Sequence, residues 1–278
     1  ENLALKYGIP MIMLDVPYAT QAEFEPQKIE YIKSQLQGIV DQLEKVTGKQ
    51  FDYNKFQEVL EISSENGRLF QKAMDLIGET VPSPASAFDE YNFMALMIIA
   101  RGKKETTEVL EMFISELEER VRDSTTTFSG VENKRVFWDG LCCWPYLRQN
   151  SESLAEKGIN MVGTPYTGNY GTTFEDLYQL CESYSSTNNA TGLQIGRDYR
   201  SSLIDRYKCD GILCNVMRSC KPWVGIMFEM ERQLASRHDI PYTMFDADQA
   251  DPRVFSEAQF ETRVQGLGEA MESRRTTG

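Results

Sequence analysis

The chain has 278 residues, enough for one large domain or two of ordinary size, and its 41% hydrophobic content can form a core. Its 42 Asp and Glu outnumber its 29 Lys and Arg, and the net charge of −13 argues against DNA or RNA binding, because such a surface repels phosphates. No apolar run approaches the roughly 20 residues of a transmembrane helix, and neither a signal peptide nor a disulfide scaffold is evident. We therefore expect a cytoplasmic protein with reduced thiols, bound to neither nucleic acid nor membrane.

The first residues, "ENLALKYGIPMIMLDVPY", combine a helical end, a glycine and an apolar run. Gly8 suits a helix C-terminus, and the continuous apolar segment after it is typical of a buried parallel strand. One helix end and one strand cannot form a domain. We interpret residues 1–19 as the end of a truncated α/β lobe whose earlier part is expected upstream of Glu1.

Residues 20–128 have the periodicity of helices. In "PQKIEYIKSQLQGIVDQLEKVTGK" apolar residues recur at helical spacing, and Pro26 suits the first helical turn. Similar patterns follow in "DYNKFQEVLEISSENGRLFQKAMDLI" and "KETTEVLEMFISELEERVRD", and the segment "FDEYNFMALMIIA" between them is apolar enough to be buried. We predict a helical region that links two lobes.

From residue 129 to residue 278, strand patterns alternate with helical ones. The predicted strands are "KRVFWDG", "INMVGT", "CDGILCNV" and "PYTMFDAD". The predicted helices lie near Tyr146–Lys157, Phe174–Tyr184, Arg197–Tyr207, Trp223–Arg237 and Ser256–Glu272. This alternation predicts an α/β fold with a Rossmann-like parallel sheet and with ligands in the loops at the carboxyl ends of its strands.

Cys220 is the cysteine with the clearest chemical potential. It follows a predicted strand and precedes Pro222, which suits the first turn of a helix. A helix N-terminus favours a thiolate, as do the neighbouring Arg218 and Lys221, and a thiolate binds metal or attacks an electrophile. The only histidine, His238, lies at the far end of the following helix, about 20 Å away by helix rise, so a Cys–His pair is rejected.

The other cysteines are better explained as buried residues. Cys209 and Cys214 are five residues apart in a predicted strand, so they face opposite ways and cannot hold one metal. Cys181 is expected in a helix core, and Cys143 is a weaker ligand candidate because it also follows a strand. There is no CxxC pattern and no glycine-rich phosphate loop, so any further metal ligands would come from elsewhere in the fold.

Several segments resemble the 2-hydroxyacyl-CoA dehydratase subunits, which are related to ATP-dependent benzoyl-CoA reductase subunits. The most specific are "VMRSCKPW", "IPYTMFDADQADPR" and "FSEAQFETRVQGL" near the carboxyl end. The segments "GIPMIMLDVPY", "SPASAFDEYNFMALMIIARG" and "WDGLCCWPYL" are also similar to that family, so the resemblance covers nearly the whole chain.

The resemblance implies an iron–sulfur enzyme built from two homologous subunits. A [4Fe–4S] cluster would be held by cysteines, of which Cys220 is the metal ligand in this chain and the others lie upstream of its first residue. A separate ATP-dependent iron–sulfur activator would supply one electron to the acyl-CoA substrate. The family removes water from an (R)-2-hydroxyacyl-CoA through a ketyl radical, giving a 2-enoyl-CoA.

The resemblance and the loop positions together suggest substrate-binding residues. Arg218 and Ser219 flank the expected cluster ligand, and Trp144, next to Pro145, could form an apolar wall. Arg253 could meet a CoA phosphate. No catalytic acid or base is assigned. The candidates Asp246, Asp248 and Asp251 are better explained as turn and cap residues, because "DPR" before "FSEAQ" is typical turn chemistry.

Three alternative functions stay open at this point. The chain could be a subunit of an aromatic acyl-CoA reductase of the benzoyl-CoA type. It could be a non-catalytic partner subunit that relays an electron or stabilises the dimer. It could also be a generic α/β ligand-binding domain whose cysteines bind no iron. The acyl group of the substrate is not specified by any motif.

Overall fold

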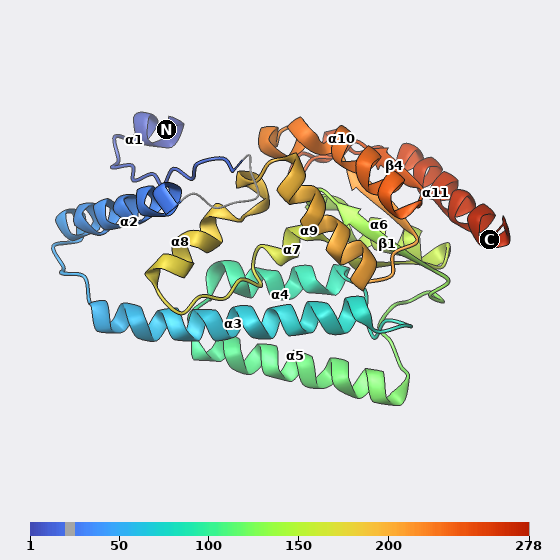
Figure 1. Cartoon of the computed structure of the whole chain (residues 1–278), viewed down its shortest axis with the longest axis horizontal. Coiled ribbons are helices and arrows are strands. Elements are labelled where there is room, and N and C mark those ends of the chain that lie inside the picture. The colour runs from blue at the N-terminus through green and yellow to red at the C-terminus, as the bar shows by residue number, and fades with distance from the viewer. Residues whose placement is uncertain (20–25, 278) are drawn as a thin grey trace.

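The computed structural model describes residues 1–19 and 26–277 of the chain. Strands and helices alternate in the second half, around one parallel sheet among the described residues, so the predicted α/β fold is confirmed. Figure 1 shows helices α3, α4 and α5 as a layer beneath this sheet, with α10 and α11 above it. The helices α1 and α2 lie at the other end of the molecule, beside α8.

The four strands of the sheet match the four predicted segments. They are β1 (Lys134–Asp139), β2 (Ile159–Gly163), β3 (Gly211–Asn215) and β4 (Tyr242–Phe245). Their order in the sheet is β2-β1-β3-β4, and all neighbours are parallel. Cys209 precedes β3, so its placement in that strand was wrong; the strand starts only where Gly211 begins to pair with β1.

Both faces of the sheet are covered, as its apolar strands require. Trp138 of β1 points into the larger core, which also holds residues of α3, α4, α5 and α11. Phe137, its neighbour in the strand, points into a smaller core formed with α9 and α10. Both side chains are fully buried. The helical region and the sheet therefore share a continuous apolar core.

The helices follow the predicted segments closely, except for the short α7, which was not predicted. In the first half they are α1 (Asn2–Tyr7), α2 (Pro26–Thr47), α3 (Tyr53–Glu79), α4 (Phe88–Ile99) and α5 (Lys104–Asp123). In the second half they are α6 (Leu147–Glu156), α7 (Pro165–Gly168), α8 (Leu177–Ser185), α9 (Leu193–Arg206), α10 (Lys221–His238) and α11 (Glu257–Thr277). The segment α4 is buried only in part, because Ile98 and Ile99 at its end are exposed.

The amino-terminal segment differs from its prediction. Gly8 ends α1 in the left-handed conformation (φ 61°), as expected for a helix C-terminus. The apolar run after it has no regular secondary structure, since no described neighbour forms a ladder with it. Instead, the Gln35 side chain hydrogen-bonds both the N–H and the carbonyl of Asp15, and Ala19 forms one isolated parallel bridge to Thr191.

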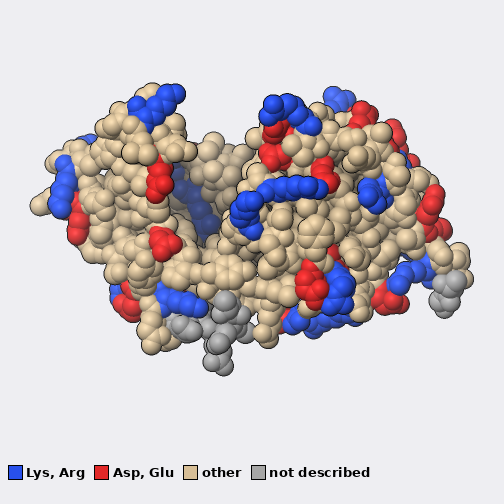
Figure 2. Space-filling model, turned by 90° about the horizontal axis from the view of Figure 1, so that it is seen from above, with Lys and Arg blue, Asp and Glu red and all other residues tan. Residues whose placement is uncertain are grey.

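Acidic and basic side chains are interspersed on the surface. Figure 2 shows both kinds scattered over the face seen from above, without a large field of one sign. Many of these side chains pair with one another, such as Arg232 with Glu229 at 2.6 Å and Arg237 with Asp198 at 3.1 Å. On this face, the charged side chains do not gather into one site.

Gly78 packs so closely against the Tyr207 ring that a larger residue at this position should destabilise the fold. A Cβ atom on Gly78 of α3 would lie 2.4 Å from the Tyr207 ring. We expect Gly78→Ala to lower the free energy of unfolding by about 1–3 kcal/mol, because the buried ring has to move. Gly38→Ala in α2 is the matched control, since nothing lies within 4 Å of its Cβ position. Urea denaturation followed by circular dichroism measures both, and equal midpoints would contradict the prediction.

Candidate functional site

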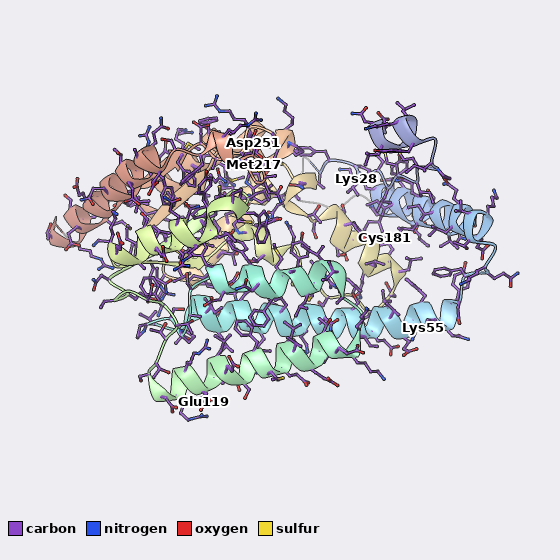
Figure 3. The ribbon with its side chains drawn as sticks, turned by 180° about the vertical axis from the view of Figure 1, so that it is seen from behind. Lys28, Lys55, Glu119, Cys181, Met217 and Asp251 are labelled. Atoms are coloured by element: carbon purple, nitrogen blue, oxygen red, sulfur yellow. The ribbon has the colours of Figure 1, made fainter. Side chains whose placement is uncertain are left out.

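The strand order brings two loops together at one edge of the sheet. β1 and β3 are neighbours, but the chain continues from them to opposite sides. Open α/β sheets bind ligands beyond the strand ends at such a switch point, and we call this region the crevice. The residues Gly140–Cys143 follow β1, and Val216–Cys220 follow β3. In Figure 3, Met217 and Asp251 lie at this end of the molecule, whereas Cys181 on α8 lies away from them.

Cys220 occupies the position that the sequence predicted. It is the N-cap of α10, with Pro222 in the first turn, and its side chain forms no capping hydrogen bond. Its N–H donates to the Met217 carbonyl at 3.0 Å, and its carbonyl accepts from the Val224 N–H at 3.0 Å. The backbone is thus fixed while the partly exposed thiol stands at the positive end of a helix dipole.

The other five cysteines, all within the described ranges, are buried. Burial raises the pKa of Cys143 to about 11 and that of Cys142 well above its usual range. It also raises the pKa of Cys181, Cys209 and Cys214. Neutral buried thiols behave as small apolar groups. Cys220 is therefore the thiol best placed to act as a ligand.

Acidic residues from the loop after β4 hold the two residues that precede Cys220. The Arg218 guanidinium donates to Asp246 through Nε at 2.7 Å and through Nη2 at 3.1 Å. The Ser219 hydroxyl donates to Asp248. Arg218 and Ser219, expected as substrate-binding residues, thus lie at the crevice and already have protein partners. These bonds tie the two loops to each other.

The acidic loop is organised by its own hydrogen bonds. Asp248 accepts from the N–H groups of Ala250 and Asp251 at 3.0 and 3.1 Å, and Asp251 accepts from the Arg253 N–H at 3.0 Å. The Ser219 hydroxyl and these N–H groups hold the pKa of Asp248 below its usual value. Arg253 also pairs with Asp251 at 2.6 Å. Asp248 and Asp251 act as turn and cap residues in this structure.

A row of aromatic rings lies beside the crevice. The Trp144 ring, 38% exposed, lies 5.7 Å from Tyr91, which lies 6.2 Å from Tyr166. Tyr166 lies 6.4 Å from Trp223 in the first turn of α10. Trp144 is thus the exposed end of an otherwise buried row, consistent with the apolar wall expected there. Tyr91 was not among the predicted site residues, because nothing in the pattern of α4 shows which ring reaches this edge.

Buried charges beneath the crevice were also missed. Asp139 ends β1 and is 1% exposed, and Arg200 of α9 donates to it through Nε at 2.5 Å. Glu231 of α10 is fully buried beside Asp139, and burial holds its pKa well above the usual range. In the sequence, the one indication of these buried charges was an acidic residue, Asp139, at the end of an apolar strand. Its partner Arg200 is 61 residues away along the chain.

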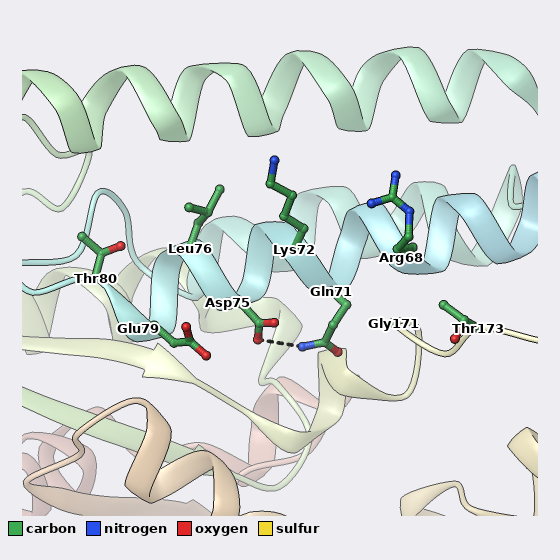
Figure 4. A pocket seen from close by; sticks show the side chains of 9 residues that line it. All are labelled: Arg68, Gln71, Lys72, Asp75, Leu76, Glu79, Thr80, Gly171 and Thr173. Carbon is green, nitrogen blue, oxygen red and sulfur yellow. Dashed lines mark hydrogen bonds between the residues drawn. The ribbon is translucent and has the colours of Figure 1, made fainter.

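The cavity drawn in Figure 4 is separate from this crevice. It has a volume of about 500 Å³ and lies between α3 and the loop after α7. Its lining residues are Arg68, Gln71, Lys72, Asp75, Leu76, Glu79, Thr80, Gly171 and Thr173. Gln71 donates to Asp75 at 2.8 Å within it. None of these residues belongs to the loops that follow β1 or β3.

Two other features are absent from residues 1–19 and 26–277. No three His, Cys, Asp or Glu side chains in these ranges group as a metal site requires. No helix in them is long and apolar enough to cross a membrane.

His238, as expected, does not meet Cys220. Its ring lies 2.8 Å from Ser201 and 3.0 Å from Asp205.

Comparison with known proteins agrees with the resemblance seen in the sequence. The family model of the 2-hydroxyglutaryl-CoA dehydratase D-component matches residues 1–271. The (R)-2-hydroxyisocaproyl-CoA dehydratase alpha subunit of Clostridioides difficile is 42% identical over 99% of this chain and 68% of its own length. The (R)-2-hydroxyglutaryl-CoA dehydratase alpha subunit of Acidaminococcus fermentans is 39% identical over 98% of this chain and 57% of its own.

A more distant relative is a benzoyl-CoA reductase subunit of Thauera aromatica. It is 23% identical over 99% of this chain and 67% of its own length. The higher identity of the dehydratase subunits agrees with the family match along almost the whole sequence. This chain belongs to the family of the 2-hydroxyglutaryl-CoA dehydratase D-component.

Proposed function

We propose that this protein is a subunit of an (R)-2-hydroxyacyl-CoA dehydratase in which Cys220 ligates a [4Fe–4S] cluster. The enzyme would remove water from a 2-hydroxyacyl-CoA to give a 2-enoyl-CoA. The observation that carries the proposal is the placement of Cys220, the one partly exposed thiol among the six, at the switch-point crevice of a chain from this family. Relatives at 38–42% identity are named as dehydratase alpha subunits.

The donor chemistry at the crevice fits one ligand of such a cluster. Iron–sulfur clusters take cysteine thiolates, and Cys220 presents its sulfur at a helix N-terminus without using it as a cap. Among the described residues, no three His, Cys, Asp or Glu side chains form a complete metal site there. The remaining ligands would then come from outside this sequence. When bound, the cluster would lend one electron to the thioester and take it back from the product, so that loss of the 2-hydroxyl group and of one β-proton is redox-neutral overall.

The residues of this chain would position the substrate and limit its contact with water. Arg218 and Ser219 are exposed at the crevice and pair with Asp246 and Asp248, which leaves their remaining hydrogen-bonding groups open to a substrate. The exposed face of Trp144 offers an apolar surface to the acyl group. Side chains that are already paired lose less freedom when they bind a substrate.

The names of the relatives support a partner subunit, and the activator is a separate proposal. They are alpha subunits, so we propose a second, homologous subunit as the partner of this chain. An ATP-dependent iron–sulfur activator would deliver the electron from outside this complex.

An aromatic acyl-CoA reductase is less supported than a dehydratase. The reductase subunit is 23% identical to this chain, whereas the dehydratase subunits are 32–42% identical.

The ligand assignment predicts the effect of Cys220→Ala. We expect this variant, in the intact protein with its partner, to lose the iron and acid-labile sulfide bound through this chain. Dehydration of 2-hydroxyacyl-CoA with activator present should fall to background. Iron and sulfide per chain, measured on anaerobically purified protein, check the prediction, with about four of each expected for the unaltered chain.

Cys181→Ala is the matched control for this experiment. Cys181 is buried against Ile29 and Ile32 and lies on α8, away from the crevice. Its removal should cost packing energy and leave the iron content unchanged. Equal iron in the Cys220 and Cys181 variants would refute the ligand assignment. Full iron with no turnover of any 2-hydroxyacyl-CoA would instead favour an electron-relay subunit or a reductase.

A further inference from the structure

A buried network beneath the crevice centres on Asp139 at the end of β1. Arg200 donates to Asp139 Oδ2 through Nε at 2.5 Å and to Oδ1 through Nη2 at 3.2 Å. Trp223 Nε1 donates to the same Oδ1 at 3.1 Å. The Arg200 guanidinium also lies 5.3 Å from the Trp223 ring centre. Asp139, Arg200 and Trp223 are all buried, with exposed fractions of 1%, 3% and 4%.

The charges in this network are balanced inside the fold. Burial alone would raise the pKa of Asp139, but the Arg200 guanidinium outweighs it and holds the pKa below its usual value. Arg200 is further fixed by hydrogen bonds to the Asn188 side chain at 3.3 Å and to the Gly196 carbonyl at 3.1 Å. An ionised Asp139 is therefore a rigid hydrogen-bond acceptor for the Trp223 indole.

Trp223 connects this network to Cys220. It lies three residues after Cys220, within the first turn of α10, and points inward while the thiol is partly exposed. The Cys220 carbonyl accepts the N–H of Val224, the residue after Trp223, so the two positions belong to one hydrogen-bonded turn. A bond that fixes the indole therefore fixes the turn on which the thiol stands.

We infer that Asp139 and Trp223 are positioning residues for Cys220, with Asp139 acting through the Trp223 indole N–H. Arg200 keeps Asp139 in place for this role. The two residues before Cys220, Arg218 and Ser219, pair with Asp246 and Asp248, so side-chain bonds flank Cys220 on both sides along the chain. The inference rests on the proposed function in so far as the positioned sulfur is a cluster ligand. The position itself can be measured without any cluster.

The reactivity of the thiol in iron-free protein tests the inference directly. Because the other five cysteines are buried, a thiol reagent such as iodoacetamide should label one cysteine per folded chain, and Cys220→Ala should abolish that labelling. Trp223→Phe keeps a large ring but removes the donor to Asp139. We expect it to raise the alkylation rate of Cys220 at least threefold, while only one thiol per chain reacts.

Trp138→Phe is the matched control, since it is the same substitution in a buried strand residue. Its indole N–H has only a 3.5 Å contact with the Leu141 carbonyl. The alkylation rate of Cys220 should be unchanged in this variant. An unchanged rate in Trp223→Phe would overturn the inference, and so would equal acceleration in both variants, because a general loosening of the core would then explain it.

A second readout separates this inference from the proposed function. In iron-loaded protein, Trp223→Phe should retain its iron but shift the electron paramagnetic resonance signal of the reduced cluster, because the ligand sulfur has moved. An identical signal would also overturn the inference. If the unaltered protein binds no iron, the proposed function fails, while the alkylation rates still decide whether Trp223 positions Cys220.

Discussion

Replacing Arg135 by alanine is expected to lower the free energy of unfolding by about 3–5 kcal/mol, the cost of breaking a buried ion pair. Arg135 and Glu132 are paired at 2.5 Å with both side chains 6% exposed. The same guanidinium donates to the backbone carbonyls of Gly78, Thr80 and Tyr207. The variant leaves a buried carboxylate and these carbonyls without their donor, so the ends of α3 and α9 lose their common link to β1.

Urea denaturation at neutral pH measures this effect, with Arg135→Lys as a variant that keeps the charge. A lysine cannot reproduce the planar fork of donors, so we expect an intermediate loss of stability. Arg148→Ala is the control, because its pair with Glu152 is 91% and 57% exposed and should contribute nothing measurable. Similar midpoints for the Arg135 and Arg148 variants would show that the buried link does not stabilise the fold.

Glu90→Gln is expected to change how stability depends on pH. Glu90 of α4 is 1% exposed, and burial raises its pKa to about 8, helped by nearby carboxylates although the Thr167 hydroxyl donates to it at 2.6 Å. The unfolded value is about 4.3, so between these limits the folded state binds one more proton. The contribution of Glu90 to the free energy of unfolding is therefore present at low pH and is lost as the pH rises toward 8.

Glutamine keeps an acceptor for Thr167 and carries no proton to lose. The stability of Glu90→Gln relative to the unaltered protein should thus increase between pH 5 and pH 8, by up to about 4 kcal/mol at about 1.4 kcal/mol per pH unit. Urea denaturation at several pH values checks this slope. Glu118→Gln, an exposed carboxylate paired with Lys72, should leave the slope unchanged. Parallel curves for all three proteins would contradict a neutral Glu90.

Much of the candidate site was predictable from local sequence. Pro222 two residues after Cys220 indicated a helix N-terminus there, and the structure confirms the N-cap. Asp248 and Asp251 of "DADQADPR" were correctly interpreted as turn and cap residues, whereas Asp246 pairs with the Arg218 side chain instead. The apolar run after Gly8 is not a strand among the described residues, because an apolar pattern forms a strand only where a neighbouring strand pairs with it.

The amino-acid sequence by itself determined the types and approximate limits of the helices and strands, and the place of Cys220 at the start of a helix. Local periodicity and capping depend on residues a few positions apart, so they can be read without the fold. Only the tertiary structure decided the strand order β2-β1-β3-β4, which places the loops after β1 and β3 side by side. It also decided that Arg200 and Trp223 meet Asp139 from 61 and 84 residues away, because buried polar groups take whichever partner the packing of the core brings to them.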